Sequence, residues 1–140
     1  MVISPLIALM RDQVQQMKAL GVAAATLNSS NSEDENRAVW RGLDTGSLRL
    51  LFISPERLGM EGLPQRLARG GITRLAVDEA HCVSQWGHDF RPDYRDIARV
   101  RDALAQGAGR AIPVLGLTAS ADRATQGDIV TQLFRAEPRV

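Results

Sequence analysis

Five short apolar runs are spaced along the 140-residue chain. They are rich in β-branched and aliphatic residues, and they are nearly continuous rather than alternating with polar positions. This pattern is typical of strands that are covered on both faces, as in a parallel sheet. We therefore predict strands at residues 2–3, 22–27, 48–53, 72–77 and 112–117.

A segment of helical period follows the first run, over residues 5–20. Pro5 suits the first position of a helix, and Gly21 suits the position just past its end. Apolar side chains recur on one predicted stripe of this helix, at Leu6, Leu9, Met10, Met17 and Leu20.

Further helical segments separate the remaining runs. Ser32 and Glu35 have the spacing of a capping box ahead of an apolar stretch. Residues 93–105 and 122–134 also have helical period. Strands that alternate with helices in this way predict an α/β domain with a mostly parallel sheet flanked by helices.

Polar residues follow four of the predicted strands. In an open α/β sheet, ligands bind beyond the carboxyl ends of the strands, which for parallel strands lie at one edge. We therefore expect one continuous site along the segments 4–5, 54–57, 78–81 and 118–120.

The segment after the fourth run carries two adjacent carboxylates, Asp78 and Glu79. Nucleotide hydrolysis needs an oxygen ligand near Mg²⁺ and a group that positions or deprotonates the attacking water. Asp78 suits the first role and Glu79 the second, and His81 could sense the terminal phosphate. The alternative is that the two carboxylates only begin a turn or cap a helix.

A zinc site is a second alternative for this region, because four possible ligands are close together in the sequence. The spacing lacks the paired ligands of structural zinc sites, and a lone cysteine after a strand is usually a small buried apolar residue. We therefore disfavour zinc at His81, Cys82, His88 and Asp89.

The stretch 82–94 concentrates aromatic residues in a chain that has only 2 Trp, 3 Phe and 1 Tyr. Aromatic faces interleaved with Arg and His suit stacking on unpaired bases and contact with phosphates. The alternative is that the rings fill the core, a role that we expect for Pro92 and Tyr94. The candidates for nucleic-acid contact are Trp86, His88, Phe90 and Arg91.

Net charge and cysteine content narrow the function classes only slightly. A formal net charge of +1 neither requires nor excludes nucleic acid. Cys82 is the only cysteine, so no intrachain disulfide can form. Because no apolar stretch approaches the roughly 18 residues of a membrane span, we expect a cytoplasmic protein without a membrane partner.

Several segments resemble one family. The letters AVDEAHCVSQWGHDFRPDY at 76–94 resemble motif II and the aromatic-rich loop of RecQ-type ATP-dependent DNA helicases, which are DEAH-box members of superfamily 2. Residues 2–30 are similar to motif Ia, 53–58 to motif Ib and 116–121 to motif III. Ser120 stands where that last motif usually has Thr, and the hydroxyl is kept.

The resemblance implies a RecA-like motor domain of the P-loop NTPase type, with ATP and Mg²⁺ as cofactors. It implies 3′ to 5′ translocation on single-stranded DNA, unwinding of duplex junctions, a role in DNA repair and recombination, and a location at the bacterial nucleoid. It also implies that a second RecA-like domain of the same protein is a partner.

The resemblance assigns roles residue by residue. Asp78 would hold Mg²⁺, Glu79 would activate water, and His81 would link the nucleotide state to DNA. The aromatic loop would couple DNA binding to hydrolysis. The motif residues expected to contact the DNA backbone or relay between sites are Ser4, Arg57, Thr118 and Ser120; for Ser4 and Thr118 the alternative is helix capping.

A phosphate-binding loop of the form G-x-x-x-x-G-K-[ST] does not occur in these 140 residues. The only lysine, Lys18, lies between Met17 and Ala19 and cannot belong to one. We therefore expect residues 1–140 to be a partial first motor domain, from motif Ia through motif III, with the Walker A segment, the second RecA-like domain and C-terminal modules outside it.

This incomplete set of motifs has consequences for the isolated chain. It should not hydrolyse ATP, because Mg²⁺ cannot replace the lost phosphate contacts. It should also expose a strand edge that is prone to association. The alternatives are a non-catalytic remnant that binds single-stranded DNA and an unfolded fragment.

Overall fold

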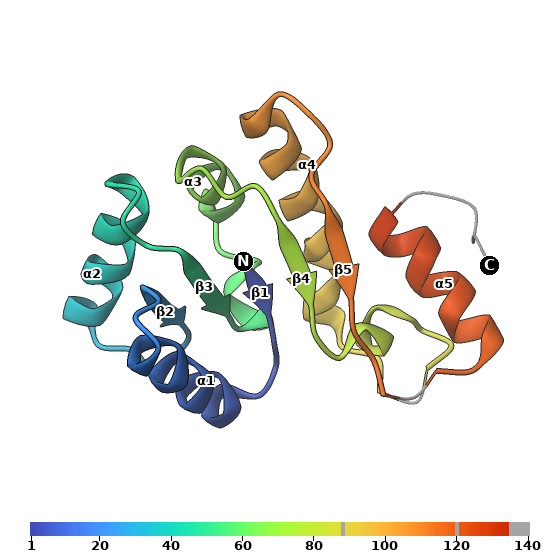
Figure 1. The fold of residues 1–140 in the computed structure, drawn as a ribbon. Coiled ribbons are helices and arrows are strands. Elements are labelled where there is room, and N and C mark those ends of the chain that lie inside the picture. The colour runs from blue at the N-terminus through green and yellow to red at the C-terminus, as the bar shows by residue number, and fades with distance from the viewer. Residues whose placement is uncertain (88, 120, 135–140) are drawn as a thin grey trace.

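The computed structural model describes residues 1–87, 89–119 and 121–134. Within these ranges the chain forms one parallel sheet with the strand order β2-β3-β1-β4-β5 (Figure 1). The predicted α/β class with a parallel sheet is therefore confirmed. The strands are β1 (Val2–Ile3), β2 (Ala24–Leu27), β3 (Leu50–Ile53), β4 (Leu75–Val77) and β5 (Val114–Gly116).

Helices connect the strands and flank the sheet. Among the described residues, no helix is both long and apolar enough to cross a membrane. The α-helices are α1 (Ile7–Ala19), α2 (Glu33–Asp44), α3 (Leu63–Arg69), α4 (Asp96–Ala108) and α5 (Arg123–Phe134), and short 3-10 helices occur at η1 (Pro55–Arg57), η2 (Ala80–Val83) and η3 (Pro92–Arg95).

The two faces of the sheet are covered unequally. Alternate strand residues such as Ile3, Ile53 and Val77 belong to a large core beneath α2, α3, α4 and α5. The intervening residues face α1, where Met10 and Val14 pack against Phe52 in a much smaller core. This alternation is the period of two that a pleated strand imposes.

Each strand other than β1 begins two residues or more after its apolar run begins. Ile72 and Ile112, for example, pack against the core, yet both precede the first ladder residue of their strand. Apolar runs report burial, whereas a strand also needs ladder hydrogen bonds. The sequence pattern therefore predicts the existence of each strand better than its first residue.

The predicted stripe on the first helix is wrong in part. Leu6, Leu9 and Leu20 are exposed, and the buried residues of α1 are Met10 and Val14. The helix begins at Ile7, so Pro5 is not its first residue. The stripe that meets the sheet has the spacing of Ile7, Met10, Val14 and Met17, which places the three leucines to its side.

The predicted ends of two helices are confirmed. Gly21 has a φ of 83° and follows α1 in a Schellman arrangement. The Gly21 N–H donates to the Lys18 carbonyl oxygen, and the Val22 N–H donates to the Met17 carbonyl oxygen. Ser32 caps α2 and forms the reciprocal capping box with Glu35. The short helix α3 was not predicted, because its seven residues are too few to display a period.

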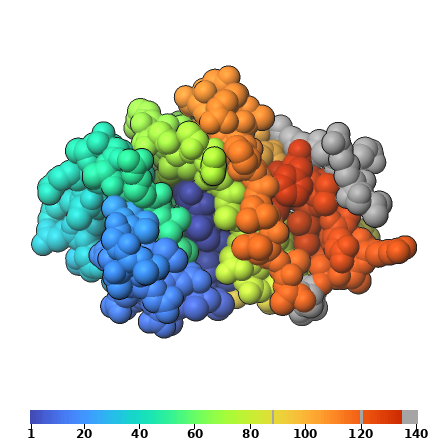
Figure 2. All heavy atoms as spheres, viewed as in Figure 1, coloured from blue at the N-terminus to red at the C-terminus, as the bar shows by residue number. Residues whose placement is uncertain are grey.

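The two edges of the sheet differ in protection. At the β2 edge, the Asn31 side-chain amide donates to the Thr26 carbonyl oxygen at 2.7 Å, which blocks a strand from pairing there. At the other edge, Leu115 and Leu117 are 57% and 47% exposed on the face that α1 leaves bare. Figure 2 shows β1 and β4 reaching the surface between α1 and β5.

Leu115→Lys is expected to lower self-association of the isolated chain, because it places a charge on this apolar face beside the outer edge of β5, with which no described strand pairs. Sedimentation velocity over a concentration series measures the effect. Leu20→Lys is the control, since Leu20 is 76% exposed at the end of α1. An equal effect of both substitutions would contradict a role for the β5 edge.

Candidate functional site at the carboxyl ends of the strands

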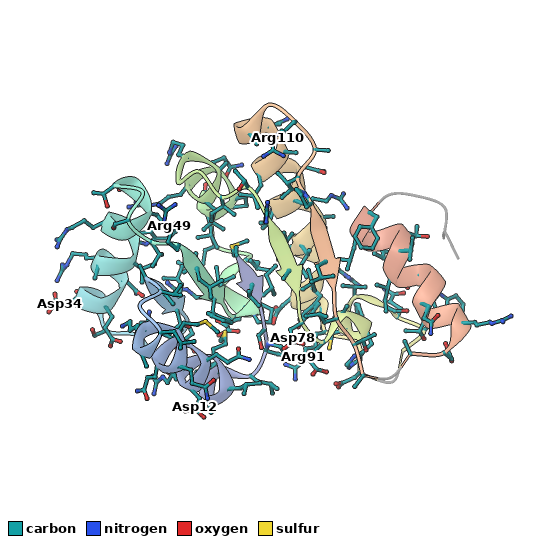
Figure 3. The ribbon with its side chains drawn as sticks, in the orientation of Figure 1. Asp12, Asp34, Arg49, Asp78, Arg91 and Arg110 are labelled. Carbon is teal, nitrogen blue, oxygen red and sulfur yellow. The ribbon has the colours of Figure 1, made fainter. Side chains whose placement is uncertain are left out.

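The parallel sheet brings the predicted strand-end segments to one edge. The hydrogen-bond ladder continues just past the ends of the strands. The backbone N–H groups of Ser4, Ser54 and Asp78 donate to the carbonyl oxygens of Ile53, Leu27 and Ile3, respectively. Figure 3 shows Asp78 and Arg91 at this end of the sheet and Arg110 at the opposite end. The expected continuous rim is therefore formed by the described residues of these segments.

The acidic pair lies at the end of β4, in the middle of the rim. Both side chains are half-buried. The Glu79 N–H donates to the Asp78 Oδ1 at 2.9 Å, which leaves Oδ2 for another ligand. A carboxylate oxygen of this kind fits the oxygen ligand that Mg²⁺ prefers.

The backbone at Glu79 is strained. Its φ of 52° and ψ of 45° are left-handed, and Glu79 is the only non-glycine residue with positive φ among the residues described. Such a conformation costs on the order of 1–3 kcal/mol and occurs preferentially at functional sites. The strain therefore marks Glu79 independently of any sequence motif.

Replacing Glu79 with glycine is expected to give a more stable chain than replacing it with alanine, by about 1 kcal/mol. Both variants lose the carboxylate, and only alanine keeps the Cβ that left-handed backbone disfavours. Urea unfolding of Glu79→Gly and Glu79→Ala measures the difference. Equal stabilities would contradict the left-handed backbone at this position.

His81 connects three parts of the site and is 5% exposed. Its Nδ1 lies 2.8 Å from Thr118 Oγ1, which joins the segments after β4 and β5. Its Nε2 lies 3.5 Å from both Glu79 Oε2 and Asp89 Oδ2. The histidine thus contacts the acidic pair, the end of β5 and the aromatic loop at once. From the sequence, Asp89 was considered only as a possible zinc ligand, and its contact with His81 was not predicted.

The aromatic loop is partly exposed, as predicted. Trp86 is 77% exposed, and the half-buried Phe90 ring has the Arg95 guanidinium 5.3 Å from its centroid. Arg91 is exposed, and its backbone N–H donates to the Cys82 carbonyl oxygen. His88 lies outside the described residues.

The two residues of this loop assigned to packing differ in outcome. Tyr94 is 2% exposed, as predicted, whereas Pro92 is exposed. Pro92 begins the 3-10 helix η3, where its fixed φ is useful and no N–H is required. The expectation that Pro92 packs in the core is therefore wrong.

Helix capping, the alternative role considered for Ser4 and Thr118, does not account for either residue. Ser4 Oγ accepts a bond from the Leu6 N–H at 3.4 Å, but the residue that caps α1 is Leu6. At α5 the capping oxygen is Asp122 Oδ1, which accepts from Thr125 at 2.8 Å. Thr118 contacts His81 instead. Ser120 lies outside the described residues.

Two buried polar atoms beside this rim lack a hydrogen-bond partner among the described residues, Ser54 Oγ and Arg57 Nε. A buried polar group without a partner is costly, so its presence calls for an explanation such as a bound water or ion. Arg57 was a candidate and Ser54 was not singled out. The signal for it was present, because Ser54-Pro55 repeats the Ser4-Pro5 pair on the neighbouring strand.

The structure gathers three of the four possible zinc ligands. One ligand atom each of His81, Cys82 and Asp89 lies within 4.8 Å of the others. Burial, followed by the negative charge of Asp89, raises the pKa of the Cys82 thiol, and a protonated thiol is a poor zinc ligand. The geometry alone does not overturn the preference against zinc.

A separate cavity of about 540 Å³ lies between α1 and α2 and is lined by Arg11, Lys18 and Asn31 among others. None of its lining residues belongs to the strand-end rim. This cavity is therefore separate from the candidate site.

Comparisons with known proteins place this geometry in a family. The profile of DEAD/DEAH box helicases matches residues 1–128. The chain is 43% identical to the ATP-dependent DNA helicase RecQ of Haemophilus influenzae over 95% of its own length, and 41% identical to that of Pasteurella multocida over 100%. It spans 21% of each of these relatives.

Solved structures agree on the fold. The Mycobacterium smegmatis helicase Lhr, bound to single-stranded DNA and AMP-PNP, superposes with a TM-score of 0.70 at 17% identity, over 98% of this chain and 18% of Lhr. The helicase MrfA bound to DNA and AMPPNP gives 0.70 at 16% identity, over 99% of this chain and 20% of MrfA. The resemblance to RecQ helicases is confirmed, and the chain belongs to the DEAD/DEAH box helicase family.

Proposed function

We propose that residues 1–140 are part of the first motor domain of a RecQ-type DNA helicase that moves 3′ to 5′ along single-stranded DNA. The observation that carries the proposal is the position of His81, which contacts Glu79, Asp89 of the aromatic loop and Thr118 after β5. A change at the loop can therefore reach the acidic pair through one buried side chain.

The chemistry assigned to the site is hydrolysis of ATP. Glu79 would orient and deprotonate the attacking water, and Asp78 would hold Mg²⁺. Bound Mg²⁺ neutralises charge that develops on the phosphate oxygens. The phosphate-binding loop and the second RecA-like domain belong to segments of the longer protein outside these residues.

The DNA-binding role is assigned to the exposed part of the rim and the aromatic loop. Trp86 presents its ring to solvent, as stacking on an unpaired base requires. The half-buried Arg57 carries a guanidinium suited to phosphate oxygens. Single-stranded DNA and duplex junctions are the proposed partners, at the bacterial nucleoid, in repair and recombination.

The experiment that tests the proposal is unwinding of tailed duplexes by the longer protein. A duplex with a 3′ single-stranded tail should be separated in the presence of ATP and Mg²⁺, whereas one with a 5′ tail should not. Binding of single-stranded DNA without ATP hydrolysis or unwinding would favour the non-catalytic remnant instead. Separation of 5′-tailed duplexes alone would contradict the assigned direction.

A further inference from the structure

The carbonyl oxygen of Asp78 cannot be satisfied by the sheet. In the ladder between β1 and β4, the Ala76 N–H donates to the Met1 carbonyl oxygen and the Asp78 N–H donates to the Ile3 carbonyl oxygen, both at 2.9 Å. Continuing this parallel register, the donor for the Asp78 carbonyl would be the N–H of residue 5. That residue is Pro5, which has no N–H.

The hydroxyl of Tyr94 supplies the missing donor. It donates to the Asp78 carbonyl oxygen at 3.0 Å, across 16 residues of sequence. Tyr94 is 2% exposed, and its burial raises the pKa of the phenol, so the hydroxyl keeps its proton. The bond ties the end of the aromatic loop, at η3, to the end of β4.

This bond fixes a peptide unit with functional side chains on both sides. Tyr94 holds the carbonyl of the peptide between Asp78 and Glu79, and Asp78 Oδ1 holds its N–H. The residue that follows, Glu79, has the left-handed φ of 52°. The orientation of this peptide therefore sets the directions in which both carboxylates project.

We propose that Tyr94 is a positioning residue, whose hydroxyl holds the Asp78–Glu79 peptide in the orientation that aims Glu79 at the attacking water. The role in hydrolysis rests on the proposed function, whereas the bond itself does not. Tyr94 thus gives the aromatic loop a contact with the acidic pair through the backbone, in addition to the side-chain contact through His81.

The bond is tested first in the 140-residue chain, without ATP. Tyr94→Phe should shift the carbonyl ¹³C resonance of Asp78 upfield and speed hydrogen exchange of the Glu79 amide, while resonances in α2 stay in place. Unchanged signals at Asp78 and Glu79 would overturn the inference. If the variant does not fold, the Tyr94 hydroxyl proton of the wild-type chain is observed instead. It should exchange slowly and show a cross-peak to Asp78, and the absence of this cross-peak would also overturn the inference.

The positioning role is tested by a double-mutant cycle in the longer protein. Tyr94→Phe should lower kcat for DNA-stimulated ATP hydrolysis by about 10- to 100-fold, with little change in the KM for ATP. In a Glu79→Gln background the same change should have almost no further effect, because its influence acts through Glu79. Val39→Ala, a truncation in the core beneath α2, is the control for general loosening and should leave kcat unchanged.

The outcomes separate this inference from the proposed function. The positioning role would be overturned if Tyr94→Phe lowered kcat by the same factor with and without the Glu79 carboxylate. An unchanged kcat despite altered Asp78 signals would also overturn it. A longer wild-type protein without ATP hydrolysis would overturn the proposed function, and with it the positioning role. The resonance measurements would still decide whether Tyr94 holds the peptide.

Discussion

Glu79→Gln in the longer protein is expected to lower kcat for DNA-stimulated ATP hydrolysis by about 10³-fold or more. Glutamine keeps the size of the side chain but cannot accept a proton from water. It can still occupy the left-handed position, at the same backbone cost that Glu79 bears. The measurement is steady-state phosphate release at saturating ATP and single-stranded DNA.

The same variant should keep its affinity for ATP and for DNA, because the substitution removes one proton acceptor and leaves the rest of the rim in place. Glu61→Gln is the matched control, since Glu61 is an exposed carboxylate just before α3 and outside the site. A Glu79→Gln protein that hydrolyses ATP within a few-fold of wild type would remove Glu79 from the mechanism.

In the longer protein, Trp86→Ala is expected to raise the DNA concentration for half-maximal ATP hydrolysis by about 10- to 100-fold, because stacking of a base on an aromatic ring contributes roughly 1–3 kcal/mol. The ring is 77% exposed, so its removal should cost the folded state little. A DNA titration of the hydrolysis rate, beside a thermal unfolding curve, separates the two effects.

Trp40→Phe is the control for this substitution, and it also allows DNA binding to be followed through the fluorescence of Trp86. Trp40 lies in α2 with the Arg66 guanidinium 4.4 Å from its ring centroid, away from the strand-end rim. In the 140-residue chain, which has 2 Trp, this variant leaves Trp86 as the sole tryptophan, and quenching of its fluorescence reports DNA binding directly, without ATP hydrolysis. An unchanged DNA titration for Trp86→Ala would contradict the role of the loop.

The fold was largely predictable because burial controls the hydrophobic pattern. Continuous apolar runs predicted parallel strands, and Ser32 with Glu35 predicted the start of α2. The pattern failed where exposure depends on what covers the sheet. Leu115 lies in a strand of the same apolar type as the others, yet one face of β5 is bare. No local pattern distinguishes a covered strand from an uncovered one.

The site was predictable as a set of strand ends, but the contacts among its residues were not. Asp78, Glu79 and His81 follow one strand in sequence, so their proximity needed no tertiary information. The contacts of His81 with Thr118 and Asp89, and of Tyr94 with the Asp78 carbonyl, depend on how the loop closes. The left-handed backbone at Glu79 also has no sequence signal, because glutamate rarely adopts it.

The measurement that tests the central claim most directly is ATP hydrolysis, with single-stranded DNA titrated, by two polypeptides. One is the 140-residue chain, and the other is the longer protein, which we propose adds a phosphate-binding loop and a second motor domain. The claim predicts no hydrolysis by the first and DNA-dependent hydrolysis by the second. Hydrolysis by the longer protein that is the same with and without DNA would contradict it.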